Sequence, residues 1–335
     1  MKSATSATWS ADKILALGRD YQGAAVLAAA AELDLWTALA PGPRSASELA
    51  GALSCDLRGL TALLDAVVAL GLLEKEGLRY LLPAGLGDFL TDQGPHSVLA
   101  MCQHQAQCLR NWSQLARVVK TGRPADCLPS VRGQAGAQEA FIGAMHNISA
   151  PNADQVVRAV QPPEFKHLLD IGGASGTWTM AFLRACPEAQ ATLFDLPHVI
   201  PMAEKRLSAA GFAQRVRLVP GDFYKDSLPS GADLAWLGAI VHQNSRAQNR
   251  ELFAKIREAL VPGGRLAIRD IVMEENRTAP VAGALFAINM LVATPGGGTF
   301  TLAELRADLE AQGFGKVVLA RPDEAMNAVV LATKP

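Results

Sequence analysis

The stretch HLLDIGGASG, residues 167–176, decides the fold that we predict for this chain. Its first five residues read as a strand, and they include Asp170. Gly172, Gly173 and Gly176 follow, and a helical pattern begins directly after them. Glycine lets the backbone approach a ligand closely, and the amides of a helix N-terminus face whatever lies over such a turn. We therefore predict a ligand-binding site at the end of a strand in an α/β sheet.

Two further strand ends point to the kind of ligand. The dinucleotide spacing G-x-G-x-x-G is absent, and an acidic residue in the first strand suits a cationic or polyhydroxyl ligand better than pyrophosphate. The next strand, 191–194, runs into Asp195, where a carboxylate can accept hydrogen bonds from both ribose hydroxyls. A third strand, 216–219, leads to three residues that could frame an adenine ring: Gly221, Asp222 and Phe223. Since open α/β sheets bind ligands at the carboxyl ends of their strands, these positions together predict a nucleoside site.

The composition favours a packed protein. The 335 residues include 31 basic and 32 acidic side chains, and 50% of the residues are hydrophobic. The longest apolar runs, 24–31 and 281–293, are shorter than the ~20 residues that cross a bilayer. Residues 1–19 lack the apolar core of a signal peptide, so we expect a cytoplasmic protein without a membrane partner. The five cysteines are odd in number and lack framework spacing, which favours reduced thiols.

The candidate ligands for a metal ion are Cys102, His104 and Cys108. On a helix, with about 100° between successive residues, the other two do not share a face with Cys102, and no second ligand pair follows. We expect no metal, and we interpret the thiols as small apolar fillers of a helix.

The N-terminal region has the pattern of a winged helix. Residues 45–48 form a capping box that predicts a helix start, and leucines between 57 and 70 recur at helical spacing before Gly71. We expect a turn at 74–77 between the strands 72–73 and 79–82.

Charge decides between the functions that a winged helix can have. Residues 1–100 hold seven basic and eleven acidic side chains, a net charge of −4, which is the wrong sign for contacts with DNA phosphates. We therefore favour packing across a dimer interface and expect no nucleic-acid partner. A regulator that senses a nucleoside without turnover remains an alternative of another class.

The chain resembles a known enzyme family. Residues 167–335 resemble the catalytic domain of class I S-adenosylmethionine (SAM) dependent methyltransferases, and the chain from about residue 20 is similar to the small-molecule O-methyltransferases of plant phenolic and bacterial secondary metabolism. The motifs that carry this resemblance are LLDIGGASG (168–176), FDLPHVI (194–200), GDFY (221–224), ALVPGGRL (259–266), ELDLWTAL (32–39), SELA (47–50) and ALGLLEKEGLRYLL (69–82).

The resemblance implies a fold and a division of the chain. The fold is α/β, a Rossmann-like SAM-methyltransferase sheet with an N-terminal all-helical winged-helix dimerisation domain. The expected domains are 1–100 for dimerisation, 101–162 as a helical connector that lines the acceptor pocket, and 163–335 for SAM binding and catalysis, after a break at Pro162 and Pro163. A homodimer is expected through the N-terminal domain.

The resemblance also implies SAM as cofactor and S-adenosylhomocysteine (SAH) as product, with no metal. Asp195 would hold the ribose, while Asp222 and Phe223 would frame the adenine. The full expected cofactor set is Asp170, Gly172, Gly173, Gly176, Asp195, Leu196, Gly221, Asp222 and Phe223.

For the reacting end, the resemblance implies a general base and a residue that orients it. Family members carry a histidine after the strand predicted at 232–237, and this chain has His242 there, with Asp270 matching the orienting carboxylate. His242 would deprotonate a hydroxyl of an aromatic or polycyclic acceptor. His146, in a preceding helix, is an alternative base.

By resemblance, seven residues would wall the acceptor pocket: Phe141, Met145, His146, Phe286, Asn289, Met290 and Thr294. An equally good interpretation of Phe286 and Met290 is that they are ordinary core residues of a helix. The family pattern is broken at three positions, since Thr299, Gly238 and Asn244 stand where many members have a glutamate, a lysine and a tryptophan. The open alternatives are methylation of carbon or nitrogen, and a relative that keeps SAM for other chemistry.

Overall fold

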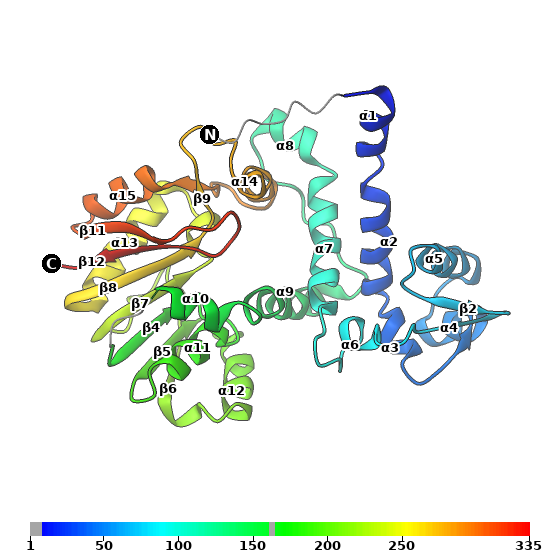
Figure 1. The fold of residues 1–335 in the computed structure, drawn as a ribbon, viewed down its shortest axis with the longest axis horizontal. Helices are drawn as coiled ribbons and strands as arrows, with labels where there is room; N and C mark the ends of the chain where they lie inside the picture. Colours follow the sequence, from blue (N-terminus) through cyan, green and yellow to red (C-terminus); the bar gives the residue numbers. More distant parts are fainter. Residues whose placement is uncertain (1–8, 161–164) are drawn as a thin grey trace. The chain divides into compact units, whose positions relative to one another are not determined.

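The computed structural model describes residues 9–160 and 165–335, so the break predicted at Pro162 and Pro163 lies outside the described residues. The chain forms two compact units. The first comprises Met1–Arg110 and Leu128–Ala144, and the second Asn111–Cys127 and Met145–Pro335. Figure 1 traces the chain from blue to red through these units.

The first unit is mainly helical. Its helices are α1 (Ala11–Leu17), α2 (Tyr21–Glu32), α3 (Leu35–Leu39), α4 (Ala46–Leu53), α5 (Leu57–Ala69) and α6 (Gly87–Leu90), together with most of α7 (Leu99–Trp112) and of α9 (Gly133–Ser149). The predicted capping box is confirmed at α4, where Ser45 N donates to Glu48 Oε2 at 2.7 Å and Glu48 N donates to Ser45 Oγ at 3.2 Å. Asp56 likewise caps α5, because its Oδ1 accepts from Gly59 N at 2.7 Å.

The wing has three strands, and its turn lies later than predicted. Strands β1 (Arg44–Ser45), β3 (Arg79–Leu81) and β2 (Glu74–Glu76) form an antiparallel sheet in that order. The expected turn at 74–77 is wrong, since 74–76 are β2 and the turn is made by Gly77, with φ +57°, and Leu78. The charged residues of β2 are all exposed, and an edge strand tolerates charges that resemble a turn signal in the sequence.

The helical stripe predicted in α5 is largely confirmed. Leu60, Leu64 and Val67 are buried in the core of the first unit, where Trp36 is fully buried and donates from Nε1 to Leu72 O at 3.0 Å. Such apolar burial stabilises the unit by about 25 cal/mol per Å².

A mixed sheet organises the second unit. In the described part of the chain its order is β11-β12-β8-β7-β4-β5-β6, with bounds β4 (His167–Ile171), β5 (Gln190–Asp195), β6 (Val216–Pro220), β7 (Ala232–Gly238), β8 (Leu260–Asp270), β11 (Gly315–Arg321) and β12 (Ala328–Thr333). Strands β11 and β12 run antiparallel to their neighbours, and the remaining pairs are parallel. The four strands predicted between 167 and 237 are confirmed to within one residue at each end.

Strand β8 begins at Leu260, so it includes the segment with Pro262, Gly263 and Gly264. A register shift against β7, between Ala232 and Leu234, accommodates this segment.

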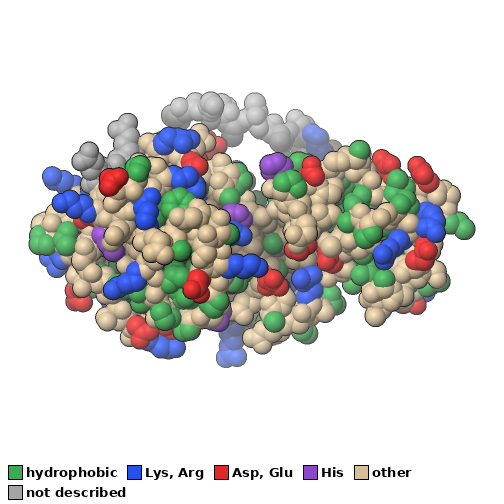
Figure 2. All heavy atoms as spheres, turned by 90° about the horizontal axis from the view of Figure 1, so that it is seen from below, with side chains coloured by type: hydrophobic (Ala, Val, Ile, Leu, Met, Phe, Trp, Pro, Cys, Tyr) green, Lys and Arg blue, Asp and Glu red, His purple; other side chains and the backbone are tan. Residues whose placement is uncertain are grey.

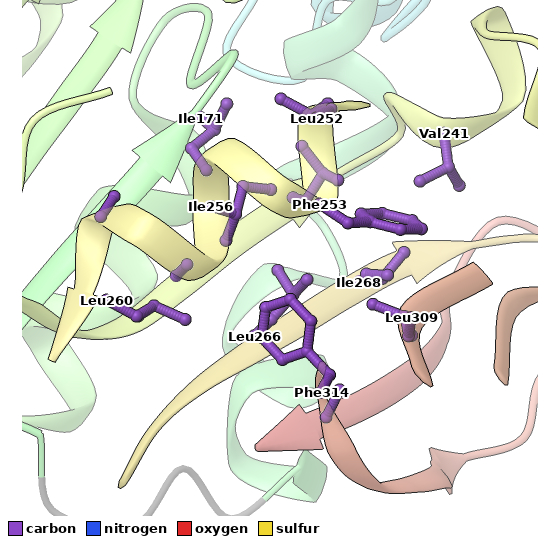
Figure 3. Packing of buried hydrophobic residues seen from close by; sticks show 14 of the residues in the cluster. Ile171, Val241, Leu252, Phe253, Ile256, Leu260, Leu266, Ile268, Leu309 and Phe314 are labelled. Carbon is purple, nitrogen blue, oxygen red and sulfur yellow. The ribbon is translucent and has the colours of Figure 1, made fainter. Parts of the chain in front are cut away.

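Helices pack on both faces of the sheet. One apolar cluster joins the sheet to α13 (Arg246–Ala259) and α15 (Leu302–Ala311), and Figure 3 shows its side chains, with Phe253, Ile256 and Leu309 facing Leu266 and Ile268. A second cluster joins the other face to α10 (Ala153–Val160) and α11 (Thr177–Ala185) through Val157, Trp178 and Phe182. The remaining elements are α8 (Leu115–Thr121), α12 (Ile200–Ala209), η1 (Ala213–Arg215), η2 (Val241–Gln243), β9 (Val272–Met273), α14 (Val281–Ala293) and β10 (Phe300–Thr301).

The surface carries both signs of charge. On the face shown in Figure 2, Lys and Arg side chains (blue) are interspersed with Asp and Glu (red), in agreement with the formal net charge of −1. Among residues 9–160 and 165–335, no helix has both the length and the apolarity that crossing a membrane requires.

Candidate active site

The glycine bend after β4 is shaped by close packing. Gly172 and Gly176 have φ angles of +69° and +80°, which favour glycine. A Cβ on Gly172 would lie 2.7 Å from the side chain of Ile240, and one on Gly173 would lie 2.6 Å from Leu193. Glycine therefore fits these two positions without displacing Ile240 or Leu193, whose side chains pack against the backbone of the bend.

Asp195 joins the ends of β4 and β5. Its Oδ2 accepts from Ala174 N at 2.7 Å, and its Oδ1 accepts from Leu196 N at 2.7 Å. Burial raises the pKa of this carboxyl, and the two backbone donors act against that rise. The structure thus brings together two strand ends that the sequence placed at one edge, with Asp195 beside the bend.

Asp170 lies beneath the bend. It is 1% exposed and accepts a hydrogen bond from Thr179 Oγ1 at 2.5 Å. Its carboxyl carbon would be 3.0 Å from a Cβ on Gly173, and burial raises its pKa to about 7. This carboxyl therefore supports the bend from below. Sequence reasoning missed Thr179. The feature that could have identified it is a hydroxyl side chain in the first turns of a mostly apolar helix.

The loop after β6 is held by side chains and by a cation. Gly221 N donates to Asp195 O at 2.9 Å, and Asp222 Oδ1 accepts from Tyr224 N at 3.0 Å. The hydrogen bond from Tyr224 N and the ammonium of Lys225 lower the pKa of Asp222. Lys255, on α13, donates from Nζ to Phe223 O at 2.8 Å and to Asp226 O at 3.0 Å. Nothing local in the sequence predicted this brace, because the lysine is far along the chain from the loop.

His242 and Asp270 form a buried pair. His242 Nδ1 lies 2.9 Å and 3.0 Å from the two carboxylate oxygens of Asp270, and the two residues are 9% and 2% exposed. Asp270 also accepts from Ile271 N at 2.8 Å. Because an ionised carboxylate only accepts hydrogen bonds, Nδ1 carries the proton and Nε2 is left as an acceptor. Asp270 is the last residue of β8, and His242 lies in η2 (Val241–Gln243), the turn that follows β7.

Residues of α14 lie against this pair. The ring of Phe286 meets His242 edge to face, with centroids 4.8 Å apart and planes at 88°. Asn289 Oδ1 accepts from Trp112 Nε1 at 2.9 Å, and Thr294 Oγ1 donates to Met290 O at 2.8 Å. Phe286 is half-buried and contacts His242, whereas Met290 is 7% exposed and packs in the interior. The contact of Trp112 was not predicted.

His146 lies in a different environment. Its Nδ1 is 2.8 Å from Thr177 Oγ1, at the start of α11. Burial, and then the charge of Arg206, lower the pKa of His146 to about 4. Met145 precedes it in α9 and is half-buried. Phe141 belongs to the first unit and meets the ring of His104 there, with centroids 5.2 Å apart.

The three positions that break the family pattern have structural partners. A Cβ on Gly238 would lie 2.6 Å from Trp236 Nε1, so the indole fills the space of a larger residue. Asn244 is fully buried, accepts from Tyr224 OH and donates to Asn249 Oδ1 at 3.0 Å. Asn249 then donates to Val241 O at 2.9 Å, which fixes the turn that carries His242. Thr299 is buried.

Among residues 9–160 and 165–335, no group of three or more His, Cys, Asp or Glu side chains is placed to hold a metal ion. Cys108 Sγ lies 3.6 Å from His104 Nε2, a contact between two half-buried side chains of α7.

Comparison with known proteins agrees with this geometry. An O-methyltransferase domain model matches residues 112–315, and an O-methyltransferase dimerisation domain model matches residues 21–84. The chain is 32% identical over 314 residues to 3-hydroxy-5-methyl-1-naphthoate 3-O-methyltransferase of Streptomyces sahachiroi, covering 92% of this chain and 91% of that one. It is 29% identical to the N,N-dimethyltransferase OxyT of Streptomyces rimosus, over 97% of each chain. Human N-acetylserotonin methyltransferase in complex with SAM superposes with a TM-score of 0.81 at 27% identity, covering 98% of this chain and 99% of that one.

Proposed function

Because the chain belongs to the O-methyltransferase family, we propose that His242 is the general base with which this enzyme methylates a hydroxyl of an aromatic or polycyclic small molecule. It is a SAM-dependent O-methyltransferase. Its relatives include an enzyme named for a hydroxynaphthoate and one named for N-acetylserotonin, both of which are aromatic hydroxyl compounds.

The residues at the strand ends fit SAM. We assign the ribose hydroxyls to Asp195, whose carboxylate ends β5 beside the glycine bend. We assign the adenine to the loop of Asp222 and Phe223, which Lys255 braces. When bound, SAM would supply a methyl group on a positively charged sulfur.

The base proposal rests on one observation, the buried pair of His242 and Asp270. A phenol has an ordinary pKa near 10, so it is a poor nucleophile at neutral pH until a base takes its proton. His242 Nε2 receives the proton of the acceptor hydroxyl, and Asp270 stabilises the imidazolium that forms. With that proton removed, the acceptor oxygen would take the methyl group that bound SAM supplies, and SAH would be the leaving group. Holding the oxygen in line with the methyl group would supply much of the rate. The aromatic edge of Phe286 and the amide of Asn289 are proposed walls of the acceptor pocket, together with Met145, His146, Met290 and Thr294.

The test is a rate measurement with a binding control. His242→Ala should lower kcat by about 10²- to 10⁴-fold with SAM and a panel of hydroxynaphthoates, and it should leave the dissociation constant of SAH within about twofold. An undiminished kcat would reject the role of His242.

A homodimer is the assembly that we propose. The dimerisation-domain match to residues 21–84 supports it, and these residues include α2 to α5 of the first unit. Sedimentation of the full chain would show twice the 35.4 kDa chain mass, and a monomer at micromolar concentration would contradict it.

Nitrogen methylation is a second candidate, favoured by the likeness to OxyT over 97% of each chain. A neutral amine attacks without prior loss of a proton, so a positioned base contributes less to its methylation. Mass spectrometry and NMR of the product of matched hydroxy- and amino-naphthoates would separate the two chemistries.

A further inference from the structure

An arginine of α12 reaches the start of α11, and the described residues show no acidic partner for it. Arg206, on α12, is half-buried and places its Nη1 3.5 Å from Ser175 Oγ. Burial lowers the pKa of this guanidinium, and no carboxylate among the described residues acts against it. Withdrawing a cation partly from water has a cost that a nearby anion reduces, so this position favours a negatively charged group.

Neutral hydroxyl groups surround this cation. Ser175 and Thr177 are 4% and 7% exposed, and their hydroxyl oxygens lie 3.4 Å apart. Thr177 Oγ1 is in turn 2.8 Å from Nδ1 of His146, which is uncharged near neutral pH because its pKa is lowered to about 4. The cluster therefore has one positive charge, two hydroxyl groups and no negative charge among its members.

The cluster is contiguous with the proposed ribose position. Ser175 directly follows Ala174, whose N–H donates to Asp195 Oδ2 at 2.7 Å. Successive Cα atoms are 3.8 Å apart, so the hydroxyl groups begin one or two residue steps from the carboxylate assigned to the ribose. In SAM the amino-acid portion is attached to the ribose through the sulfur, and its carboxylate is the single anionic group of the molecule.

We propose that Arg206, with the hydroxyl groups of Ser175 and Thr177, holds the carboxylate of the amino-acid portion of SAM. This assignment rests on the proposed placement of the ribose at Asp195. A guanidinium forms charge-assisted hydrogen bonds with a carboxylate, often two in parallel, and it is fixed in a plane by its fork of donors. His146 acts as a positioning residue that orients the hydroxyl of Thr177. Arg206 thereby selects ligands that carry the amino acid over nucleosides that lack it.

The experiment compares two ligands that differ in this group. SAH has the carboxylate, whereas 5′-methylthioadenosine keeps the adenosine and the sulfur and lacks the amino acid. Isothermal titration calorimetry of the full chain would give both dissociation constants for the wild type, Arg206→Lys and Arg206→Gln. The expected result for Arg206→Gln is a loss of SAH affinity of about 10- to 100-fold, with 5′-methylthioadenosine changed by less than twofold. The SAH affinity of Arg206→Lys should lie between that of the wild type and that of Arg206→Gln.

Arg217→Gln is the matched control, because it removes the same charge from an exposed position on β6. It should change neither affinity. The proposal is overturned if Arg206→Gln weakens both ligands equally, since Arg206 would then act through the fold, or if SAH affinity is unchanged. A wild type that binds neither ligand would instead overturn the cofactor assignment, so the two failures are distinguishable.

Discussion

Two histidines of the second unit differ in the charge that accompanies them. His242 has the carboxylate of Asp270 at 2.9 Å from Nδ1, whereas His146 has a threonine hydroxyl at 2.8 Å and the positive charge of Arg206 nearby. Both side chains are largely shielded from solvent. A carboxylate favours the imidazolium and a guanidinium disfavours it, so only His242 is equipped to receive a proton. The residue type alone thus says little about the role, which is set by the partner.

Removing the carboxylate of Asp270 should remove the difference between the two histidines, and we expect this change to have the largest effect on kcat. Asp270→Asn keeps the size of the side chain and loses its charge, so the imidazolium of His242 is no longer stabilised. We expect kcat to fall by about 10²- to 10⁴-fold, as expected for an oriented base that loses its partner. Steady-state kinetics at saturating SAM would measure this, with SAH affinity as the control. A fall of less than fivefold would mean that Asp270 does not assist His242.

The carboxyl of Asp170 is buried like the two histidines, and its hydrogen-bond partner is the neutral hydroxyl of Thr179. The pKa of Asp170 is raised to about 7 by burial, above the ordinary value of 3.8. Between these pH values the folded state binds more protons at this group than the unfolded state, so its contribution to stability is complete below about pH 4 and is lost as pH rises to about 7.

Asp170→Asn should remove that part of the pH dependence. Urea unfolding at pH 5 and pH 7.5 would show that the variant loses at least about 1 kcal/mol less free energy of unfolding between these two values than the wild type loses. Equal losses would contradict the burial of a proton at Asp170. Thr179→Val is a useful second variant, because it removes the hydroxyl that donates to the same carboxyl.

The smallest predicted effect concerns the ring contact of His242. Phe286→Leu keeps an apolar side chain and loses the edge-to-face contact, which is worth about 0.5–1.5 kcal/mol. We expect kcat to fall by about two- to tenfold, with thermal stability nearly unchanged. If SAH affinity fell by a larger factor than kcat, Phe286 would be assigned to the site of the methyl donor and not to that of the methyl acceptor.

The sequence predicted the parts of the site that depend on local pattern. Strand ends with glycine and aspartate, and the capping box at Ser45, were readable because each is encoded within a few residues. The turn of the wing was misplaced because exposed charges on β2 resemble loop composition. Asp170 could be found as a strand-end acid, but its burial below the bend depends on how α11 packs on the sheet.

Contacts between distant segments could not be predicted. Lys255 reaches the carbonyls of Phe223 and Asp226, and Arg206 reaches Ser175, across separations of about 30 residues. No periodicity or motif encodes such a contact, since it depends on which helices become neighbours after the sheet forms. Side chains that brace a site from another element are therefore found only in the folded chain.

The most direct test measures methyl transfer in a single turnover for His242→Ala and His146→Gln side by side, with SAM in excess over Kd and one hydroxynaphthoate acceptor that the wild type methylates. The different partners of the two imidazoles predict a loss of at least about 100-fold for His242→Ala and of less than tenfold for His146→Gln. A full rate in His242→Ala together with a collapsed rate in His146→Gln would assign the base to the other histidine and contradict the role given to Asp270.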